Sequence, residues 1–192
     1  SRDWSSDVCS SDLFKIDVSI YKYYINYFIF IIMYYIWMKA PFGRIGGKNK
    51  LSKKIIELFP PINSYNIYVE PFVGAGNIFF AKPYLHNQLE VINDLDDNIY
   101  KVMKLLKNRN KYLNDNVNRK IDREYFNSIK NKTDAVSIFE RLKTSYFNDG
   151  RYFNTLKKNK PYHEITTDFT PYKERLKNTI ILNNSFERSE EH

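Results

Sequence analysis

The sequence contains little cysteine and little histidine. Its 192 residues include one cysteine, Cys9, and three histidines, His86, His163 and His192. One cysteine excludes a disulfide scaffold, and these residues cannot form a Cys/His cluster with zinc-site spacing. We therefore expect no metal site. A hydrophobic fraction of 43% and an aromatic fraction of 17% argue against a disordered chain, and the length is that of one domain.

Long hydrophobic runs are also scarce. Tyr23–Met38 has sixteen residues without a charge, whereas a membrane helix needs about 20 apolar residues, so we expect no membrane span. The segment also lacks the basic start and the cleavage site of a secretory signal. Residues 14–37 are interpreted as a hydrophobic extension that is not native, with Met38 as the true start. A genuine membrane helix is the alternative.

The two ends of the chain differ in composition from the middle. Residues 1–13, SRDWSSDVCSSDL, are rich in serine and aspartate, whereas lysine, asparagine, isoleucine and tyrosine dominate afterwards. This segment looks like translated sequencing-adapter DNA, and residues 188–192, RSEEH, look like the matching adapter. We expect neither segment to belong to the gene product. The alternative is that they are ordinary polar termini.

Acidic residues are outnumbered by basic ones. The chain has 30 lysines and arginines against 22 acids, a net charge of +8, which favours nucleic acid over an anionic membrane as partner. Residues 101–160 hold 16 of the basic residues and 6 of the acids. Aromatic residues are interspersed among these basic residues. Such a surface can neutralise the phosphate backbone with its cations and stack its rings on a displaced base. The alternative is a soluble helical surface with its core aromatics.

The order of apolar segments predicts an α/β fold. The expected elements are a helix at Ser52–Phe59, a strand at Asn66–Glu70, a helix start at Asn77–Lys82, a strand at Glu90–Asp94, a helix at Asp96–Lys107, helices at Asp122–Lys130 and Ala135–Tyr146, a hairpin at Phe147–Phe153 and a last strand at Asn178–Leu182. Alternation of strand and helix is typical of a doubly wound parallel sheet. No internal repeat is evident.

A glycine-containing turn follows the first of these strands. In Tyr68–Gly76, YVEPFVGAG, the turn allows close approach of a ligand and frees amides at a helix N-terminus. Asp94 lies 20 residues after Gly74, at the end of the next strand, where an acid can bind ribose hydroxyls. Phe79 replaces the third glycine of a dinucleotide fingerprint, so a nucleoside without a diphosphate fits better than NAD. Alternatively, Asp94 caps the following helix.

A second glycine-rich segment lies near the start of the expected domain. Pro41–Lys50, PFGRIGGKNK, is no Walker A loop, because Phe42 and Asn49 stand where glycine and serine or threonine are needed. The turn can bring Arg44 or Lys48 against an anion such as a carboxylate.

These motifs together resemble one protein family. GRIGGKNKL, YVEPFVGAGNIFF and VIND, in this order and spacing, are similar to motifs X, I and II of the Dam-type adenine-specific DNA methyltransferases. The resemblance implies an incomplete Rossmann-like domain that binds S-adenosylmethionine, with a mainly helical DNA-recognition insert. It assigns Lys48 and Arg44 to the methionine end of the cofactor and Asp94 to its ribose. The residues assigned to the cofactor site are Arg44, Lys48, Glu70, Pro71, Phe72, Gly74, Gly76 and Asp94.

The resemblance also implies the domain organisation and the partners. Residues 38–107 would form the N-terminal part of the cofactor domain, residues 108–177 the recognition insert, and residues 178–187 the return to the catalytic domain. The implied partner is double-stranded DNA, methylated on the exocyclic amine of adenine, as in restriction–modification systems. The full-length protein is expected to be a monomer in the cytoplasm of a prokaryote or encoded by a phage.

The family's catalytic motif is absent from this sequence. Its [DNS]-P-P-[YFW] tetrapeptide holds the flipped adenine, whereas the one Pro-Pro pair here, Pro60–Pro61, has the wrong flanks and precedes motif I. We therefore assign no catalytic residue and expect this chain, as a fragment, to be inactive. The alternatives are a non-catalytic nucleic-acid-binding module and a membrane-anchored protein.

Overall fold

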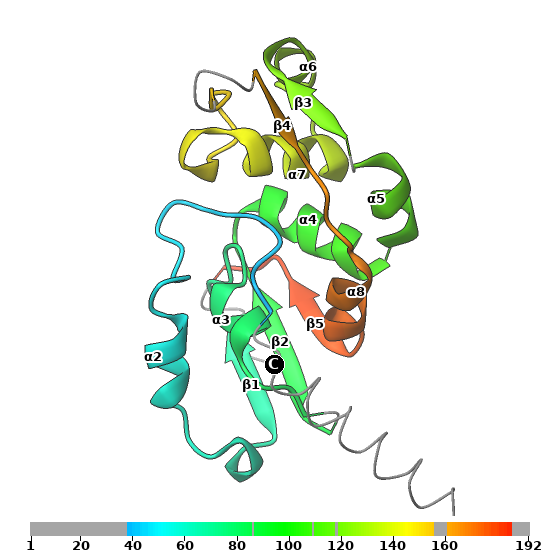
Figure 1. The fold of residues 1–192 in the computed structure, drawn as a ribbon. Coiled ribbons are helices and arrows are strands. Elements are labelled where there is room, and N and C mark those ends of the chain that lie inside the picture. The colour runs from blue at the N-terminus through cyan, green and yellow to red at the C-terminus, as the bar shows by residue number, and fades with distance from the viewer. Residues whose placement is uncertain (1–37, 86, 109, 118, 156–160, 186–192) are drawn as a thin grey trace, which may run out of the picture. The chain divides into compact units, whose positions relative to one another are not determined.

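The computed structural model of the protein describes residues 38–85, 87–108, 110–117, 119–155 and 161–185 (Figure 1). The first elements are α2 (Ser52–Glu57), the 3-10 turn η1 (Ile62–Ser64), β1 (Ile67–Glu70), α3 (Asn77–Ala81), β2 (Leu89–Asn93) and α4 (Asp97–Asn108). They are followed by α5 (Asn110–Asn116), β3 (Lys120–Asp122), α6 (Arg123–Ile129), α7 (Ala135–Thr144), the 3-10 turn η2 (Tyr146–Asn148), β4 (Tyr162–Glu164), α8 (Thr170–Leu176) and β5 (Thr179–Leu182).

Three strands form a parallel sheet in the order β1-β2-β5. Tyr68 of β1 lies opposite Glu90 of β2, which lies opposite Thr179 of β5. Helix α3 connects β1 to β2, whereas everything from α4 to α8 lies between β2 and β5 in the sequence. The parallel sheet and the mixed α/β class that the sequence predicts are confirmed.

The two faces of this sheet have different surroundings. Ile92 of β2 belongs to one apolar core with Phe79 of α3, Met103 of α4 and other buried side chains. On the opposite face, Ile67 of β1 and Ile180 of β5 are 53% and 44% exposed. The helices that enclose the core therefore gather on one face of the sheet.

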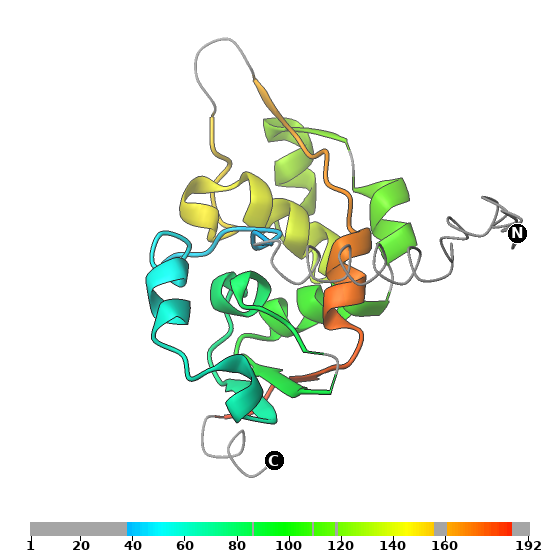
Figure 2. The ribbon, with the colours of Figure 1, turned by 60° about the horizontal axis from the view of Figure 1, so that its bottom comes forward.

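The segment between α4 and α8 builds a second, mainly helical region. Helix α7 packs against α4 and α6, and β3 pairs with β4 in a short antiparallel ladder. Figures 1 and 2 show α4 between this region and the sheet. Buried Phe126, Phe139 and Phe169 connect the interior of the region to the core beneath the sheet. The two regions consequently share one hydrophobic core.

Two aspartates begin helices in this region. Asp122 accepts a hydrogen bond from the amide of Tyr125 at 2.8 Å, and Asp134 accepts one from the amide of Ser137 at 2.9 Å. Such side chains satisfy amides that the first helical turn leaves unpaired. The two helices predicted here are confirmed as α6 and α7, although α7 ends at Thr144, earlier than predicted.

The segment predicted as a hairpin, residues 147–153, has a more irregular geometry. It is closed by one antiparallel bridge between Ser145 and Phe153. Phe147 and Asn148 have left-handed φ angles of 52° and 56°, so the chain reverses through the turn η2 before the expected two-residue turn. The predicted hairpin is therefore confirmed only in part, as one bridge between Phe153 and Ser145, which lies before the predicted segment.

Four short elements were not predicted from the sequence. Strands β3 and β4 have three residues each, which is too short for a period of two to be visible. Helix α8 begins with Thr170 and Pro171 and has Arg175 in its last turn, a usable signal of helix ends. Helix α5, Asn110–Asn116, is polar along most of its length, and a helix without an apolar stripe gives no periodic signal.

Several predictions concern residues that the structure does not describe. The segments 1–13, 14–37 and 188–192 lie outside the described residues. Within the described ranges, no helix is both long and apolar enough to cross a membrane. In the same part of the chain, no group of three or more His, Cys, Asp or Glu side chains could hold a metal ion.

Candidate functional site

The carboxyl ends of the three parallel strands carry the candidate site. Glu70 ends β1, Asp94 follows β2, and Asn183 follows β5. The Asn183 amide donates hydrogen bonds to the carbonyl oxygens of Asp94 and Leu95 at 2.8 and 3.1 Å. Ligands of open α/β sheets bind in the crevice outside this edge. The loop with Asp94 is thus fixed from the neighbouring strand, which the sequence analysis did not anticipate.

Asp94 joins the loops after β1 and β2. One carboxylate oxygen accepts from the amide of Gly74 at 2.8 Å, and the other accepts from the amide of Asp96 at 2.9 Å. Helix α4 is capped by Asp96 instead, which accepts from the amide of Asn98 at 2.9 Å. The alternative that Asp94 caps the helix is therefore wrong. A carboxylate has about four lone-pair positions, so two remain for hydroxyl donors.

The glycines of the turn after β1 have different tasks. Gly76 has a left-handed φ of 77°, and a Cβ atom there would lie 2.7 Å from the ring of Phe80, so only glycine fits. The Gly76 amide donates to the carbonyl of Val73 at 2.8 Å, and the Gly74 amide donates to Asp94. The amides of Gly74 and Gly76, which precede α3, therefore already have protein partners.

A cavity of about 320 Å³ lies at this edge, within the size range of small-molecule sites. It is lined by six of the eight residues that the sequence assigned to the cofactor, namely Arg44, Lys48, Glu70, Phe72, Gly74 and Asp94. Pro71 and Gly76 do not line it. Ile45, Val73, Asn77 and Ile78, which the sequence analysis did not single out, also line it.

Glu70 is a partly buried acid of this cavity. Burial raises its pKa to about 7, against the opposing effects of the Tyr68 hydroxyl, the Phe79 amide and the charge of Lys82. The Tyr68 hydroxyl donates to Glu70 at 2.7 Å. The two residues are two apart on β1 and therefore share one face of the strand. Glu70 can consequently be neutral or charged near pH 7.

Two cations of the glycine-rich segment ahead of α2, Arg44 and Lys48, line the cavity. The Nζ atom of Lys48 donates to the carbonyl of Gly46 at 2.7 Å. Arg44 forms an ion pair with Asp96, with 2.7 Å between Nη2 and Oδ2. Partial burial opposes ionisation of Asp96, but the hydrogen bonds from Arg44 and the Asn98 amide outweigh it and lower the pKa of Asp96. Lys48 is the cation of this pair without an acidic partner among the described residues.

A buried cluster of charges supports the sheet beneath the site. Glu90 of β2 accepts hydrogen bonds from both terminal nitrogens of Arg175 on α8, and its Oε1 lies 2.5 Å from the Nζ of Lys82. Glu90 is 1% exposed. The cluster lines no cavity of the site, and we interpret it as the connection that holds α8 to the sheet.

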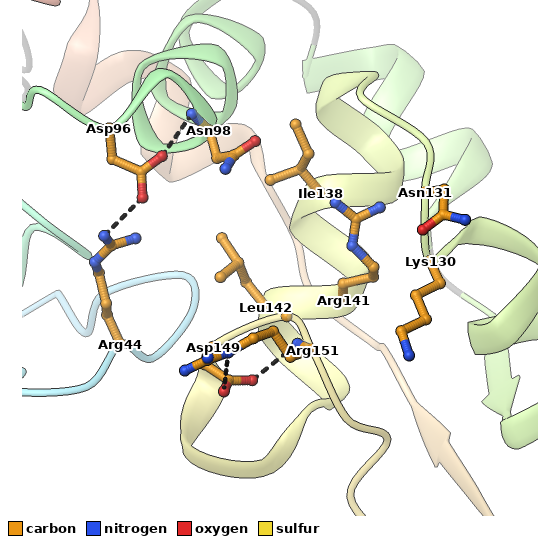
Figure 3. A pocket seen from close by; sticks show the side chains of 11 residues that line it. Arg44, Asp96, Asn98, Lys130, Asn131, Ile138, Arg141, Leu142, Asp149 and Arg151 are labelled. Carbon is orange, nitrogen blue, oxygen red and sulfur yellow. Dashed lines mark hydrogen bonds and ion pairs between the residues drawn. The ribbon is translucent and has the colours of Figure 1, made fainter.

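A second cavity, of about 340 Å³, adjoins the first on the side of the helical region (Figure 3). Figure 3 shows Arg44 and Asp96 on one side of it, with Arg141 of α7 and Lys130 across from them. Arg151 lies at the loop end and pairs with Asp149 at 2.9 Å. Arg44 lines both cavities and therefore forms a shared wall.

The loop after α7 exposes aromatic rings beside these cations. Phe147 is 79% exposed and Tyr152 is 64% exposed. The Nζ of Lys130 lies 5.5 Å from the centre of the Tyr152 ring. Arg141, by contrast, is engaged by the backbone, because its Nη1 donates to the carbonyl oxygens of Ile129 and Lys132. The loop after α7 thus brings exposed aromatic rings close to the cations Lys130 and Arg151.

Comparison with known proteins agrees with this geometry. Over 159 residues, the chain is 26% identical to the modification methylase StsI of Streptococcus sanguinis; the aligned region covers 81% of this chain but 21% of that methylase. The sequence model of the D12 class N6 adenine-specific DNA methyltransferases matches residues 45–191, well over half of the chain. The chain therefore belongs to the D12 class of N6 adenine-specific DNA methyltransferases.

Proposed function

We propose that the cavity at the strand ends binds S-adenosylmethionine and that the protein serves in methylation of the exocyclic amine of adenine in double-stranded DNA. The observation that carries the proposal is the position of Asp94. It lies at the carboxyl end of β2, is tied to the Gly74 turn, and lines the cavity together with Lys48 and Glu70. An acid placed in this way is suited to a ribose.

The chemistry of the cavity fits the three polar parts of this cofactor. The remaining lone pairs of Asp94 can accept from ribose hydroxyls. Lys48 can hold a carboxylate, and Glu70 can accept from an ammonium group. When bound, the cofactor supplies a methyl group activated by its sulfonium charge. The protein's own part is to hold that group in a fixed orientation, which is the main requirement of such a transfer.

We propose that the helical region contacts the DNA. Lys130 and Arg151 can neutralise backbone phosphates. The exposed rings of Phe147 and Tyr152 can stack on bases or wedge between them. The full-length protein is proposed to act as a monomer in the cytoplasm, encoded by a prokaryote or by a phage.

The chain is proposed to bind both ligands without transferring a methyl group. No described side chain in either cavity belongs to a tetrapeptide of the [DNS]-P-P-[YFW] type, and the sequence contains only the Pro60–Pro61 pair. Holding the adenine amine in line with the methyl group is the task of that motif in the family. The aligned part of the chain spans 21% of the streptococcal methylase.

The test is a titration of the full 192-residue chain with S-adenosylmethionine, followed by calorimetry, and with a DNA duplex, followed by fluorescence anisotropy. We expect saturable binding of both and no incorporation of labelled methyl groups into DNA. Incorporation would overturn the inactivity of the chain. DNA binding without cofactor binding would instead support the non-catalytic nucleic-acid-binding module, which the exposed loop aromatics and cations also favour.

A further inference from the structure

We propose that Asp96 is a positioning residue that holds the guanidinium of Arg44 at the nucleoside end of the cofactor cavity, where its planar face can pack against adenine. The proposal rests on the proposed binding of S-adenosylmethionine. It differs from the expectation drawn from the family resemblance, which places Arg44 at the methionine end. It also assigns a ligand-related task to Asp96, which the sequence analysis left without one.

The first argument is the path of the Arg44 side chain. A Cβ atom on Gly74 would lie 3.7 Å from the Cδ atom of Arg44, so the stem of Arg44 lies over the turn after β1. Its guanidinium reaches the loop after β2, where Nη2 is 2.7 Å from Asp96. Arg44 therefore crosses from the loop of β1 to the loop of β2 and ends beside the acid proposed for the ribose.

The second argument concerns the connection between Asp96 and Asp94. The amide of Asp96 donates to one carboxylate oxygen of Asp94 at 2.9 Å. The Asp96 carboxylate binds Arg44 through one oxygen and the amide of Asn98 through the other. Figure 3 shows both of these contacts as dashed lines. The ribose acid and the guanidinium are thus held by one loop, and their relative position follows from its hydrogen bonds.

The third argument is electrostatic. A guanidinium that already pairs with a carboxylate at 2.7 Å is a weaker receptor for a second carboxylate, such as that of the methionine end. Lys48 has no acidic partner among the described residues and is better suited to that role. An arginine whose edge is engaged still presents its flat face, which stacks on aromatic rings. The pairing with Asp96 therefore favours stacking over ion pairing with the ligand.

The glycine-rich segment explains why Arg44 needs a positioning residue. Gly46 has a φ of 76°, and nothing lies within 4 Å of the place where its Cβ would be. The turn is closed by a hydrogen bond from the amide of Gly47 to the carbonyl of Arg44 at 2.9 Å. Glycines give such a turn conformational freedom. A contact 52 residues away in the sequence, at Asp96, then fixes the direction of the arginine.

The experiment compares two ligands of the full chain. S-Adenosylmethionine contains both ends, whereas 5′-methylthioadenosine lacks the amino acid, and each is titrated calorimetrically or by displacement of labelled S-adenosylmethionine. R44Q is expected to weaken both ligands about fivefold, as loss of a cation–π contact predicts. K48Q is expected to weaken S-adenosylmethionine alone. If R44Q weakens S-adenosylmethionine but leaves methylthioadenosine unchanged, Arg44 acts at the methionine end and the proposal is overturned.

Asp96 is tested by D96N, with D97N as the matched control. Asparagine caps helices about as well as aspartate, so D96N removes the charge and keeps the cap of α4. We expect D96N to weaken both ligands about threefold with an unchanged thermal midpoint, and D97N to change neither. In the R44Q background D96N should have no further effect, because it acts only through Arg44. An additive effect, or no effect of D96N alone, would show that Asp96 does not position Arg44.

The result for the unaltered chain separates this inference from the proposed function. If it binds neither ligand, the proposed cofactor site is wrong and the inference fails with it. If it binds S-adenosylmethionine and methylthioadenosine does not compete, the site exists but the nucleoside end is not recognised, and only the inference fails. If R44Q weakens the binding of both ligands by the same factor, and D96N does so too, the result supports both the inference and the proposed cofactor site.

Discussion

The sheet region and the helical region of this protein present their polar groups in opposite ways. Around the sheet, Asp94 and Glu90 are tied to backbone amides or buried cations, so their positions are fixed before any ligand binds. On the helical side, Phe147 and Arg151 stand on an exposed loop. The difference fits the proposed functions, in which the groups at the strand ends hold a small cofactor and the exposed loop contacts DNA.

The largest expected effect tests how the two regions are joined. R175M leaves the buried carboxylate of Glu90 with Lys82 as its ion-pair partner. Because removing one partner of a buried pair is costly, the free energy of unfolding in urea should fall by about 3 kcal/mol. The control is K101M, which removes a surface pair with Asp97 and should cost less than about 0.5 kcal/mol. Equal stability of the two variants would show that the buried cluster does not hold α8 to the sheet.

The next effect concerns the pH dependence of the sheet region. The pKa of Glu70 is raised by burial to about 7, so its carboxyl is more readily protonated in the folded chain than in the unfolded one. Its contribution to stability is then fully present below about pH 4.5 and is lost as the pH rises through 7. Relative to E70Q, the unaltered chain should lose about 2 kcal/mol over this interval, measured by urea unfolding at each pH. A constant difference between the two would contradict the raised pKa.

A smaller effect is expected on ligand affinity, where a change at the strand ends should weaken cofactor binding but not DNA binding. D94N removes the charge that would accept from the ribose and weakens the tie to the Gly74 turn. Hydrogen bonds to charged groups contribute about 1.5–3 kcal/mol, so affinity for S-adenosylmethionine should fall at least about tenfold in calorimetry. Affinity for DNA should remain within about twofold. The matched control, D97N, changes a residue three positions away and should leave both affinities unchanged. If D94N weakens DNA binding as much as cofactor binding, the two ligands do not use separate regions.

The smallest effect is expected on the exposed loop. F147A removes a ring that is 79% exposed, so the melting temperature should not fall. Because stacking on a base contributes about 1 kcal/mol or more, DNA affinity should fall about fivefold in fluorescence anisotropy, with cofactor affinity unchanged. Y112A is a suitable control, since Tyr112 is a half-exposed ring on α5, away from the loop. Equal losses in both variants would mean that aromatic exposure alone, and not this loop, governs DNA binding.

The accuracy of the sequence predictions followed the length and periodicity of each element. Helix α4 was predicted almost to the residue, because its apolar side chains repeat with helical spacing over twelve residues. The three-residue strands β3 and β4 carry no such repeat and were missed. Cavity residues that belong to a contiguous motif, such as Glu70 and Gly74, were identified. Asp96 was not, since its partner Arg44 is 52 residues away and no spacing rule connects them.

The sequence by itself determined the parallel sheet, the family and six of the residues that line the cavity at the strand ends. Local periodicity and compact motifs encode these features, and both can be read along the chain. The tertiary structure decided how the motif residues are used. In the folded chain, the amides of Gly74 and Gly76 donate to protein acceptors. Arg44 forms an ion pair with Asp96, and Glu90 forms a buried ion pair with Arg175. Such pairings depend on which distant segments the shared core brings together, and hydrogen bonds and burial act through space rather than along the sequence.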